Sequence, residues 1–385
     1  MQVDTPDLRR LRVDQVGSLL RPQSLIDAFL AVGRGEIDDA ALAVAQDAAI
    51  ADVVARQEQA GLPILTDGEY RRLNWQVSFA EVEGWDLSAG SWRAFLANPT
   101  LVGAHEKPLS KGDDAVVSFR VPATGRLSLG RNFPLTEFDF AQNLTERPVK
   151  AMLMGPDRVA QMCDIPGSAP HYADADAFLA DVVAIQRRMV GDLVQAGCAY
   201  VQLDEPSYTG YVDPETLTRL EAAGEDPVAN LERAIAADNA VIAGLEGRAV
   251  FGLHVCRGNR ASMWHREGTY DAIAERLLTG LRFDRLLLEY DSERAGGFEP
   301  LRFVPKGADG PTVVLGLITT KHGTVEEPDD LVRRIEDAAR FVPVEQLALS
   351  PQCGFASGIA GNMLGPDAQW RKLEVMLETA DRVWG

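Results

Sequence analysis

The stretch Ala249-Val-Phe-Gly-Leu-His-Val-Cys256 decides how the fold and the chemistry of this chain are interpreted. It is an apolar run rich in strand-forming residues, and the polar sequence Arg257-Gly-Asn259 follows it at once. A short apolar run that ends in polar residues is typical of a buried β-strand. Because side chains alternate along a strand, we expect His254 and Cys256 on the same side of it, at its carboxyl end.

Two further apolar runs also end in a residue type that binds metals. Leu347-Ala-Leu-Ser-Pro-Gln-Cys353 ends in a cysteine, and Arg285-Leu-Leu-Leu-Glu289 ends in a carboxylate. A lone cysteine or histidine would indicate ordinary core packing. Imidazole and thiolate together suit zinc, so the combination favours a metal site. The candidate Zn²⁺ ligands are His254, Cys256, Glu289 and Cys353.

The composition describes a globular protein with an acidic balance of charge. Of the 385 residues, 46% are hydrophobic and 25% are charged, which leaves ample apolar material for a large core. The formal net charge of −19 argues against nucleic acid and against an anionic membrane surface as partners. Four cysteines in so long a chain predict no disulfide framework. We find neither a signal peptide nor a membrane-spanning run, and we expect a cytoplasmic protein.

Apolar runs alternate with helix-periodic segments along most of the chain. The helical segments cover about 38–60, 173–196, 226–245, 269–280, 328–340 and 366–383. Near-continuous apolar runs are typical of parallel strands that are buried on both faces. The pattern predicts an α/β fold, a single (β/α)8 TIM barrel over residues 1–385, whose functional groups lie at the carboxyl ends of the strands. The eight expected strands are 13–18, 62–69, 149–154, 200–206, 249–256, 285–290, 312–319 and 347–351.

Residues of about 80–147 interrupt this alternation. They contain Trp85, Trp92 and several Gly and Pro residues, and two strand-like runs at 115–121 and 124–130. We interpret the segment as an insertion that bears a β-hairpin. Two roles are open for it, a lid over the site and a contact in a homo-oligomer.

The expected ligand set indicates chemistry on sulfur. Two thiolates and one imidazole on zinc leave a fourth position, which Glu289 can occupy as a carboxylate that is more easily displaced than a thiolate. A zinc ion with such a position binds an incoming thiol and lowers its pKa, which supplies a thiolate nucleophile. The pattern therefore favours alkyl transfer to sulfur over hydrolysis by a zinc-activated water molecule.

Other polar residues at the strand ends are candidates for binding a substrate. Glu69 and Asp204 can hold the ammonium group of an amino acid, and Ser18 can donate to a carboxylate. His322 can transfer a proton, although a lone histidine in a loop is more often a surface residue. The two acids can equally serve as ion-pair partners of the nearby arginines Arg71, Arg72 and Arg257.

Six stretches together resemble the catalytic half of cobalamin-independent methionine synthase, and more closely the short single-barrel members of that family. The resemblance covers most of the chain, but residues 80–147 take no part in it. The stretches are Val16-Gly-Ser18, Thr66-Asp-Gly-Glu69-Tyr-Arg-Arg, Gln202-Leu-Asp204-Glu-Pro206, His254-Val-Cys256-Arg-Gly-Asn259, Leu288-Glu289-Tyr-Asp-Ser-Glu-Arg294 and Ser350-Pro-Gln-Cys353-Gly.

The resemblance implies a fold, an activity and roles for the site residues. It implies methyl transfer to the zinc-bound thiolate of homocysteine, which gives methionine. It implies contacts with homocysteine from Ser18, Glu69 and Asp204, and proton transfer by His322. The metal ligands that it implies are the four already named, His254, Cys256, Glu289 and Cys353.

Several alternatives remain open at this point. The chain has no room for the second, N-terminal barrel with which full-length members help to hold the folate tail. The methyl donor is therefore methyltetrahydrofolate, methylcobalamin on a partner protein, or a small methylated compound. Another thiol is an alternative acceptor, such as coenzyme M with an epoxide. A metal-free decarboxylase-like barrel and a barrel with a closed structural zinc that binds a ligand or partner complete the alternatives.

Overall fold

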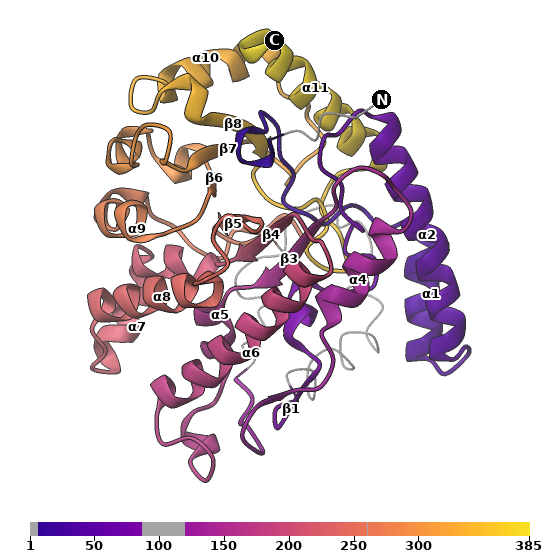
Figure 1. Ribbon diagram of the computed structural model, residues 1–385, viewed down its shortest axis with the longest axis vertical. Coiled ribbons are helices and arrows are strands. Elements are labelled where there is room, and N and C mark those ends of the chain that lie inside the picture. Colours follow the sequence, from indigo (N-terminus) through magenta and orange to yellow (C-terminus); the bar gives the residue numbers. More distant parts are fainter. Residues whose placement is uncertain (1–6, 87–119, 260) are drawn as a thin grey trace.

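The computed structural model describes residues 7–86, 120–259 and 261–385. Its centre is a parallel sheet in which six strands pair strictly in chain order, and every residue of these strands is buried. Each strand is followed by helical segments that lie outside it (Figure 1). The six strands are β3 (Lys150–Met154), β4 (Tyr200–Asp204), β5 (Val250–Val255), β6 (Arg285–Glu289), β7 (Thr312–Ile318) and β8 (Leu347–Pro351).

Two N-terminal segments close the ring between β8 and β3. Val13 forms a parallel bridge with Leu349 of β8, and Leu65 forms one with Val149, next to β3. The expected strands 13–18 and 62–69 are therefore single bridges, and the prediction of regular ladders there is wrong. Side chains replace part of the missing ladder, since Thr66 Oγ1 donates to the carbonyl of Gly17 at 2.7 Å. The chain thus fills all eight positions of a β/α barrel with six regular strands.

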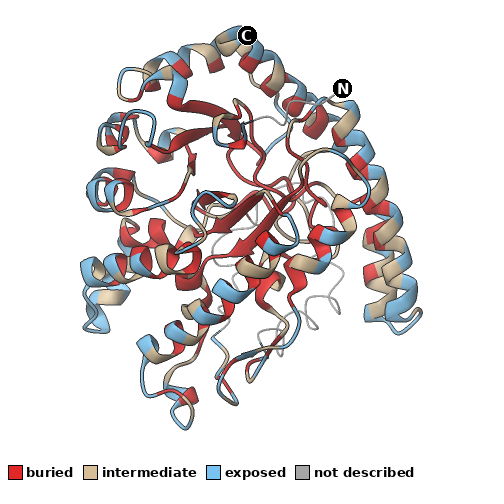
Figure 2. Ribbon diagram, in the orientation of Figure 1, coloured by how far each residue is buried: buried red, intermediate tan, exposed pale blue. Residues whose placement is uncertain are grey.

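The helices form an outer layer with a buried side toward the strands and an exposed side away from them (Figure 2). Their beginnings follow local chemistry, because Asp38, Asp174 and Asp226 each accept a backbone N–H in the first turn of the following helix. The six expected helical segments are found, with shifted ends. The helices are α1 (Gln23–Gly33), α2 (Asp39–Gln59), α4 (Phe133–Gln142), α5 (Pro156–Ala160), α6 (Ala175–Gln195), α7 (Pro214–Ala222), α8 (Pro227–Ile242), α9 (Ala274–Gly280), α10 (Pro328–Ala338) and α11 (Pro366–Trp384).

The expected insertion is only partly separate from the barrel. Its two-stranded ladder pairs β1 (Val82–Glu83) with β2 (Ser128–Leu129) in antiparallel fashion, whereas most of the expected hairpin strand 115–121 lies outside the described residues. Helix α4, inside the 80–147 range, packs against β3 as a barrel helix does. Trp85 is buried and meets Phe178 of α6 edge to face, with 5.3 Å between ring centroids. In the described part of the chain, no helix is long and apolar enough to cross a bilayer.

A buried ionic cluster holds the N-terminal segment against the starts of the strands. Asp14 accepts from Lys150 at 2.9 Å, from Arg285 at 3.0 Å and from the Tyr200 hydroxyl at 2.8 Å. Arg285 also donates to three backbone carbonyls of residues 8–11. Burial alone would raise the pKa of Asp14, but the two cations hold it below its usual value. The cluster therefore joins three strand starts, β3, β4 and β6, to the first segment of the barrel.

We expect Asp14→Asn to lower the free energy of unfolding by about 3–5 kcal/mol, because it leaves two buried cations without their carboxylate. Urea unfolding at neutral pH measures the change. Asp47→Asn is the matched control, since Asp47 pairs with Arg71 but its side chain is 46% exposed, and there we expect a loss below about 1 kcal/mol. Equal effects of the two substitutions would contradict a central role for the cluster.

Candidate metal centre

Three of the expected ligands meet at the carboxyl ends of two strands. His254 lies near the end of β5, Cys256 follows that strand directly, and Cys353 lies two residues beyond β8. One ligand atom from each residue lies within 4.8 Å of the others, and all three residues are buried. Alternation along β5 brings His254 and Cys256 to the same side, as the sequence predicts.

The hydrogen-bond partners of these donors fit a metal ion. Both ring nitrogens of His254 are buried without a hydrogen-bond partner among the described residues. Leaving a buried polar atom unpaired costs about 1–3 kcal/mol, so such atoms require an explanation. The neighbouring Cys353 holds the pKa of the Cys256 thiol well below its usual value, against burial, which raises it. An imidazole with free nitrogens beside a thiol that readily ionises is a suitable donor set for zinc.

Glu289 lies on the strand next to His254 and Cys256. It is the last residue of β6 and is fully buried. Its Oε2 accepts the backbone N–H of Arg257 at 2.7 Å, whereas its Oε1 has no partner in the described part of the chain. Burial raises its pKa to about 7, and the charge of Lys321 opposes that shift. Glu289 is not part of the group whose ligand atoms all lie within 4.8 Å, so its role as fourth ligand stays a prediction.

The two expected substrate-binding acids lie near this centre. Asp204 is the last residue of β4 and is paired in register with His254. Burial raises the pKa of Asp204, and His254 opposes the shift. Glu69 has a left-handed backbone with φ of 58°, which is rare for a residue with a side chain, and such strained residues cluster at functional sites. Burial raises its pKa to about 7, against the charge of Arg72 and with a contribution from Asp204, and its Oε2 has no partner among the described residues.

Ser18 and the cysteine-bearing loop are packed closely together. The Ser18 hydroxyl accepts the N–H of Ala356 at 3.3 Å, and its carbonyl accepts the N–H of Phe355 at 2.8 Å. A Cβ added to Gly354 would lie 1.9 Å from the Ser18 Oγ, so a larger residue directly after Cys353 would displace the Ser18 hydroxyl. The structure therefore brings Ser18 beside the Cys353 loop, and its contact with substrate stays a prediction.

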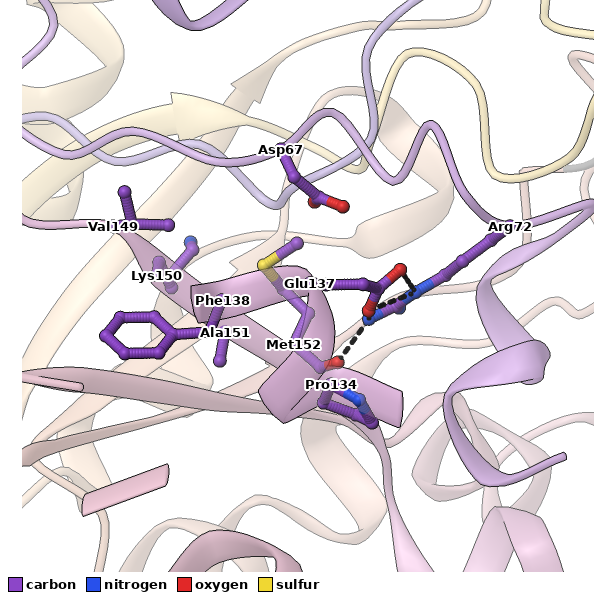
Figure 3. A pocket seen from close by; sticks show the side chains of 9 residues that line it. All are labelled: Asp67, Arg72, Pro134, Glu137, Phe138, Val149, Lys150, Ala151 and Met152. Carbon is purple, nitrogen blue, oxygen red and sulfur yellow. Dashed lines mark hydrogen bonds and ion pairs between the residues drawn. The ribbon is translucent and has the colours of Figure 1, made fainter. Parts of the chain in front are cut away.

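The arginines named as alternative partners of the acids are mostly engaged elsewhere. Arg71 pairs with Asp47 on α2. Arg72 binds Glu137 of α4 at 2.6 Å and lies 3.5 Å from Glu69, so the ion-pair alternative holds for Glu69 only as a secondary contact. Figure 3 shows this Arg72–Glu137 pair beside a narrow cavity that Asp67 and Met152 also line. Arg257 donates to the carbonyls of Gly268 and Glu289.

The region after β7 differs most from expectation. His322 is exposed, whereas its neighbour Lys321 is buried and reaches the loop that follows Cys256. Proton transfer by His322 stays a prediction. Neither Lys321 nor Glu137 was singled out from the sequence, because a charged residue that turns inward looks like any surface residue in the pattern. The only available signal for Lys321 was its place after a fully apolar strand.

Comparisons with known proteins agree with this site. The family model for the cobalamin-independent synthase catalytic domain matches residues 118–380. The uncharacterized protein YxjG of Bacillus subtilis (strain 168) is 33% identical over 97% of this chain and 94% of its own length. The 5-methyltetrahydropteroyltriglutamate--homocysteine methyltransferase of Mycolicibacterium paratuberculosis is 27% identical over 96% of this chain, which aligns with 42% of that longer protein. A candidate vitamin-B12-independent methionine synthase from Listeria monocytogenes has a solved structure with a TM-score of 0.73 and 28% identity, and the match covers 97% of this chain and 98% of that one.

The barrel, its strand-end donors and these matches define a TIM-barrel enzyme of the methyltransferase class. Within that class, the chain belongs to the cobalamin-independent synthase family, through the catalytic domain of that family. Members of this family are methionine synthase-type methyltransferases. The decarboxylase-like barrel considered above is therefore not the family of this chain.

We expect Cys353→Ser to lose bound metal while the barrel stays folded, because a serine hydroxyl is a poor substitute for a thiolate donor. Elemental analysis of the purified variant gives metal per chain, and circular dichroism checks the fold. Cys163→Ser is the matched control, since Cys163 is also buried but does not belong to the donor group. Full metal content in Cys353→Ser would remove this residue from the ligand set.

Proposed function

We propose that the protein is a zinc-dependent S-methyltransferase that transfers a methyl group to the thiolate of homocysteine and forms methionine. The observation that carries the proposal is the group of His254, Cys256 and Cys353, in which neither imidazole nitrogen has a hydrogen-bond partner of ordinary geometry among the described residues. His254, Cys256 and Cys353 would hold the zinc ion, with Glu289 as the fourth ligand. When bound, zinc lowers the pKa of a thiol and makes it a nucleophile at neutral pH.

The chain's own side chains would bind and orient the amino acid. Asp204 and the free Oε2 of Glu69 would accept from its ammonium group, because a buried carboxylate and an ammonium form strong charge-assisted hydrogen bonds. Ser18, beside the Cys353 loop, would donate to its carboxylate. Water is largely excluded, since Ser18, Glu69 and Asp204 are at most 7% exposed. Low exposure strengthens each of these interactions.

We propose a methylated folate as the methyl donor. We also propose that the protein acts in the cytoplasm. The support for the folate donor is the family name, which sets cobalamin aside, and the printed name of the Mycolicibacterium relative, which acts on a methylated pteroyltriglutamate. Methylcobalamin lacks such support.

Coenzyme M is a weaker candidate for the thiol. A sulfonate requires cationic partners, and the nearby arginines Arg71, Arg72 and Arg257 each already bind protein groups. The acids Glu69 and Asp204 instead suit the ammonium group of an α-amino acid, and Oε2 of Glu69 has no partner among the described residues.

X-ray absorption at the zinc edge tests the proposal on the purified, zinc-loaded protein with and without L-homocysteine. We expect the number of sulfur ligands to rise from two to three when homocysteine is added. A centre that is unchanged by homocysteine but gains sulfur from coenzyme M would favour the other thiol. A protein that cannot take up zinc would overturn the proposal.

Asp204→Asn should weaken the binding of homocysteine by about tenfold or more while zinc is retained, because an amide replaces the charged acceptor of the ammonium. Calorimetric titration of the zinc-loaded protein measures the change. Asp27→Asn is the matched control, since Asp27 lies on the outer helix α1, where it accepts from Gln23. Unchanged affinity in Asp204→Asn would remove this residue from the ammonium site.

Binding of L-methionine, whose thioether does not titrate, should tighten as the pH rises through about 7. Burial raises the pKa of Glu69 to about 7, and a carboxyl group attracts an ammonium group only after it has lost its proton. Dissociation constants measured between pH 5.5 and 8.5 report the trend. Glu69→Gln should flatten it, and a profile with the same slope in wild type and variant would assign the titration to another group.

A further inference from the structure

Lys321 is a buried cation at the centre of the catalytic face. It follows β7, which lies between β6 and β8 in the sheet, and these two strands lead to Glu289 and Cys353. Only 4% of Lys321 is exposed, although the next residue, His322, is exposed. Lys321 therefore places a positive charge between the strand ends that lead to two proposed metal ligands.

The hydrogen bonds that the Lys321 ammonium forms with described residues all go to neutral acceptors. Nζ donates to the carbonyl of Gly258 at 2.7 Å, to Oδ1 of Asn259 at 3.2 Å and to the carbonyl of Met263 at 3.3 Å. It also lies 5.3 Å from the ring centre of Trp264. None of these hydrogen bonds to described residues ends on a carboxylate. A buried charge without an opposite charge is costly, so the compensating charge must lie further away.

The proposed metal ligands supply that opposite charge. Burial raises the pKa of Glu289, and the Lys321 charge is the strongest influence against this shift. Contact with Cys256 and burial raise the pKa of Cys353, and Lys321 again opposes them. One divalent ion with two thiolates, a carboxylate and a neutral imidazole carries one negative charge. A substrate thiolate would add a second negative charge, whereas a thioether would add none.

The loop to which Lys321 donates, around residues 258–259 and 261–263, has strained backbone positions and is fixed by hydrogen bonds. Ala261 and Ser262 both have left-handed backbones, with φ of 45° and 66°, which residues with a side chain rarely adopt. Asn259 donates to Thr320 and to the carbonyl of Gly354, both at 2.8 Å, and thereby joins this loop to the ends of β7 and β8. The ammonium is thus held in one place instead of moving with a flexible side chain.

We propose that Lys321 is a positioning residue that makes the site selective for an anionic sulfur group, because its fixed charge compensates the negative charge that a thiolate adds to the metal centre. The inference rests on the proposed function and deepens it. Lys321 favours the homocysteine thiolate over the neutral thioether of methionine, and this difference assists exchange of product for substrate. It does not touch the reacting atoms.

The test compares two ligands that differ in charge at sulfur. Calorimetry on the zinc-loaded protein gives dissociation constants for L-homocysteine and L-methionine in wild type, Lys321→Gln and Lys321→Arg. The glutamine keeps hydrogen-bond donors without the charge, and the arginine keeps the charge. We expect Lys321→Gln to raise the dissociation constant of homocysteine on the order of tenfold or more, while that of methionine changes less than about threefold. Lys321→Arg should retain most of the preference.

Lys306→Gln is the matched control, since Lys306 is exposed and donates to the carbonyl of Arg302. If Lys321→Gln does not fold, Asn259→Asp provides a second variant, because it places a carboxylate beside the ammonium and should also reduce the preference for homocysteine. Equal weakening of both ligands would assign Lys321 a merely structural role, and an unchanged ratio would overturn the inference. A wild-type protein that binds no homocysteine would instead refute the proposed function.

Discussion

The barrel depends on the buried contact between Asp14 and the two cations Lys150 and Arg285. A closed barrel requires continuous pairing around its ring, yet the first two strand positions of this chain pair through single bridges. The ionic cluster supplies cohesion where the ladder is short, because Asp14 is tied to the starts of β3, β4 and β6 at once. Removing one partner from such a cluster leaves uncompensated buried charge, which makes the arrangement hard to replace piece by piece.

The two ends of the strands differ in how far their buried polar atoms have partners. At the starts, the side chain of Asp14 has an ion-pair or hydrogen-bond partner at both oxygens. At the carboxyl ends, both nitrogens of His254 and one oxygen each of Glu69 and Glu289 have no partner among the described residues. The barrel therefore has one face where buried polar groups are paired and contribute to stability, and one face where unpaired groups can receive a ligand. This separation of stability and function is usual in β/α barrels. Lys321 belongs to the second face, because its charge has no ion-pair partner among the described side chains.

Much of the fold and of the donor group could be predicted from local patterns. Strand alternation placed His254 and Cys256 on one side of β5, and helix periodicity located α2, α6 and α11 within a few residues. The first two strands were overestimated, because an apolar run shows burial but not whether its backbone pairs in a ladder. Within the range 80–147, α4 packs against β3 as part of the helical layer, although its surroundings in the sequence are irregular.

The sequence by itself determined the order of the strands, the residue types at their carboxyl ends and the acidic character of the chain, because these follow from periodicity and composition. Only the tertiary structure decided that Arg72 turns to Glu137, that Asp14 joins Lys150 and Arg285, and that Lys321 turns inward while His322 does not. These choices depend on which charges meet after residues 65 to 271 positions apart are brought together. Local sequence does not predict such long-range contacts, because the free energy of a buried charge depends on its neighbours in space.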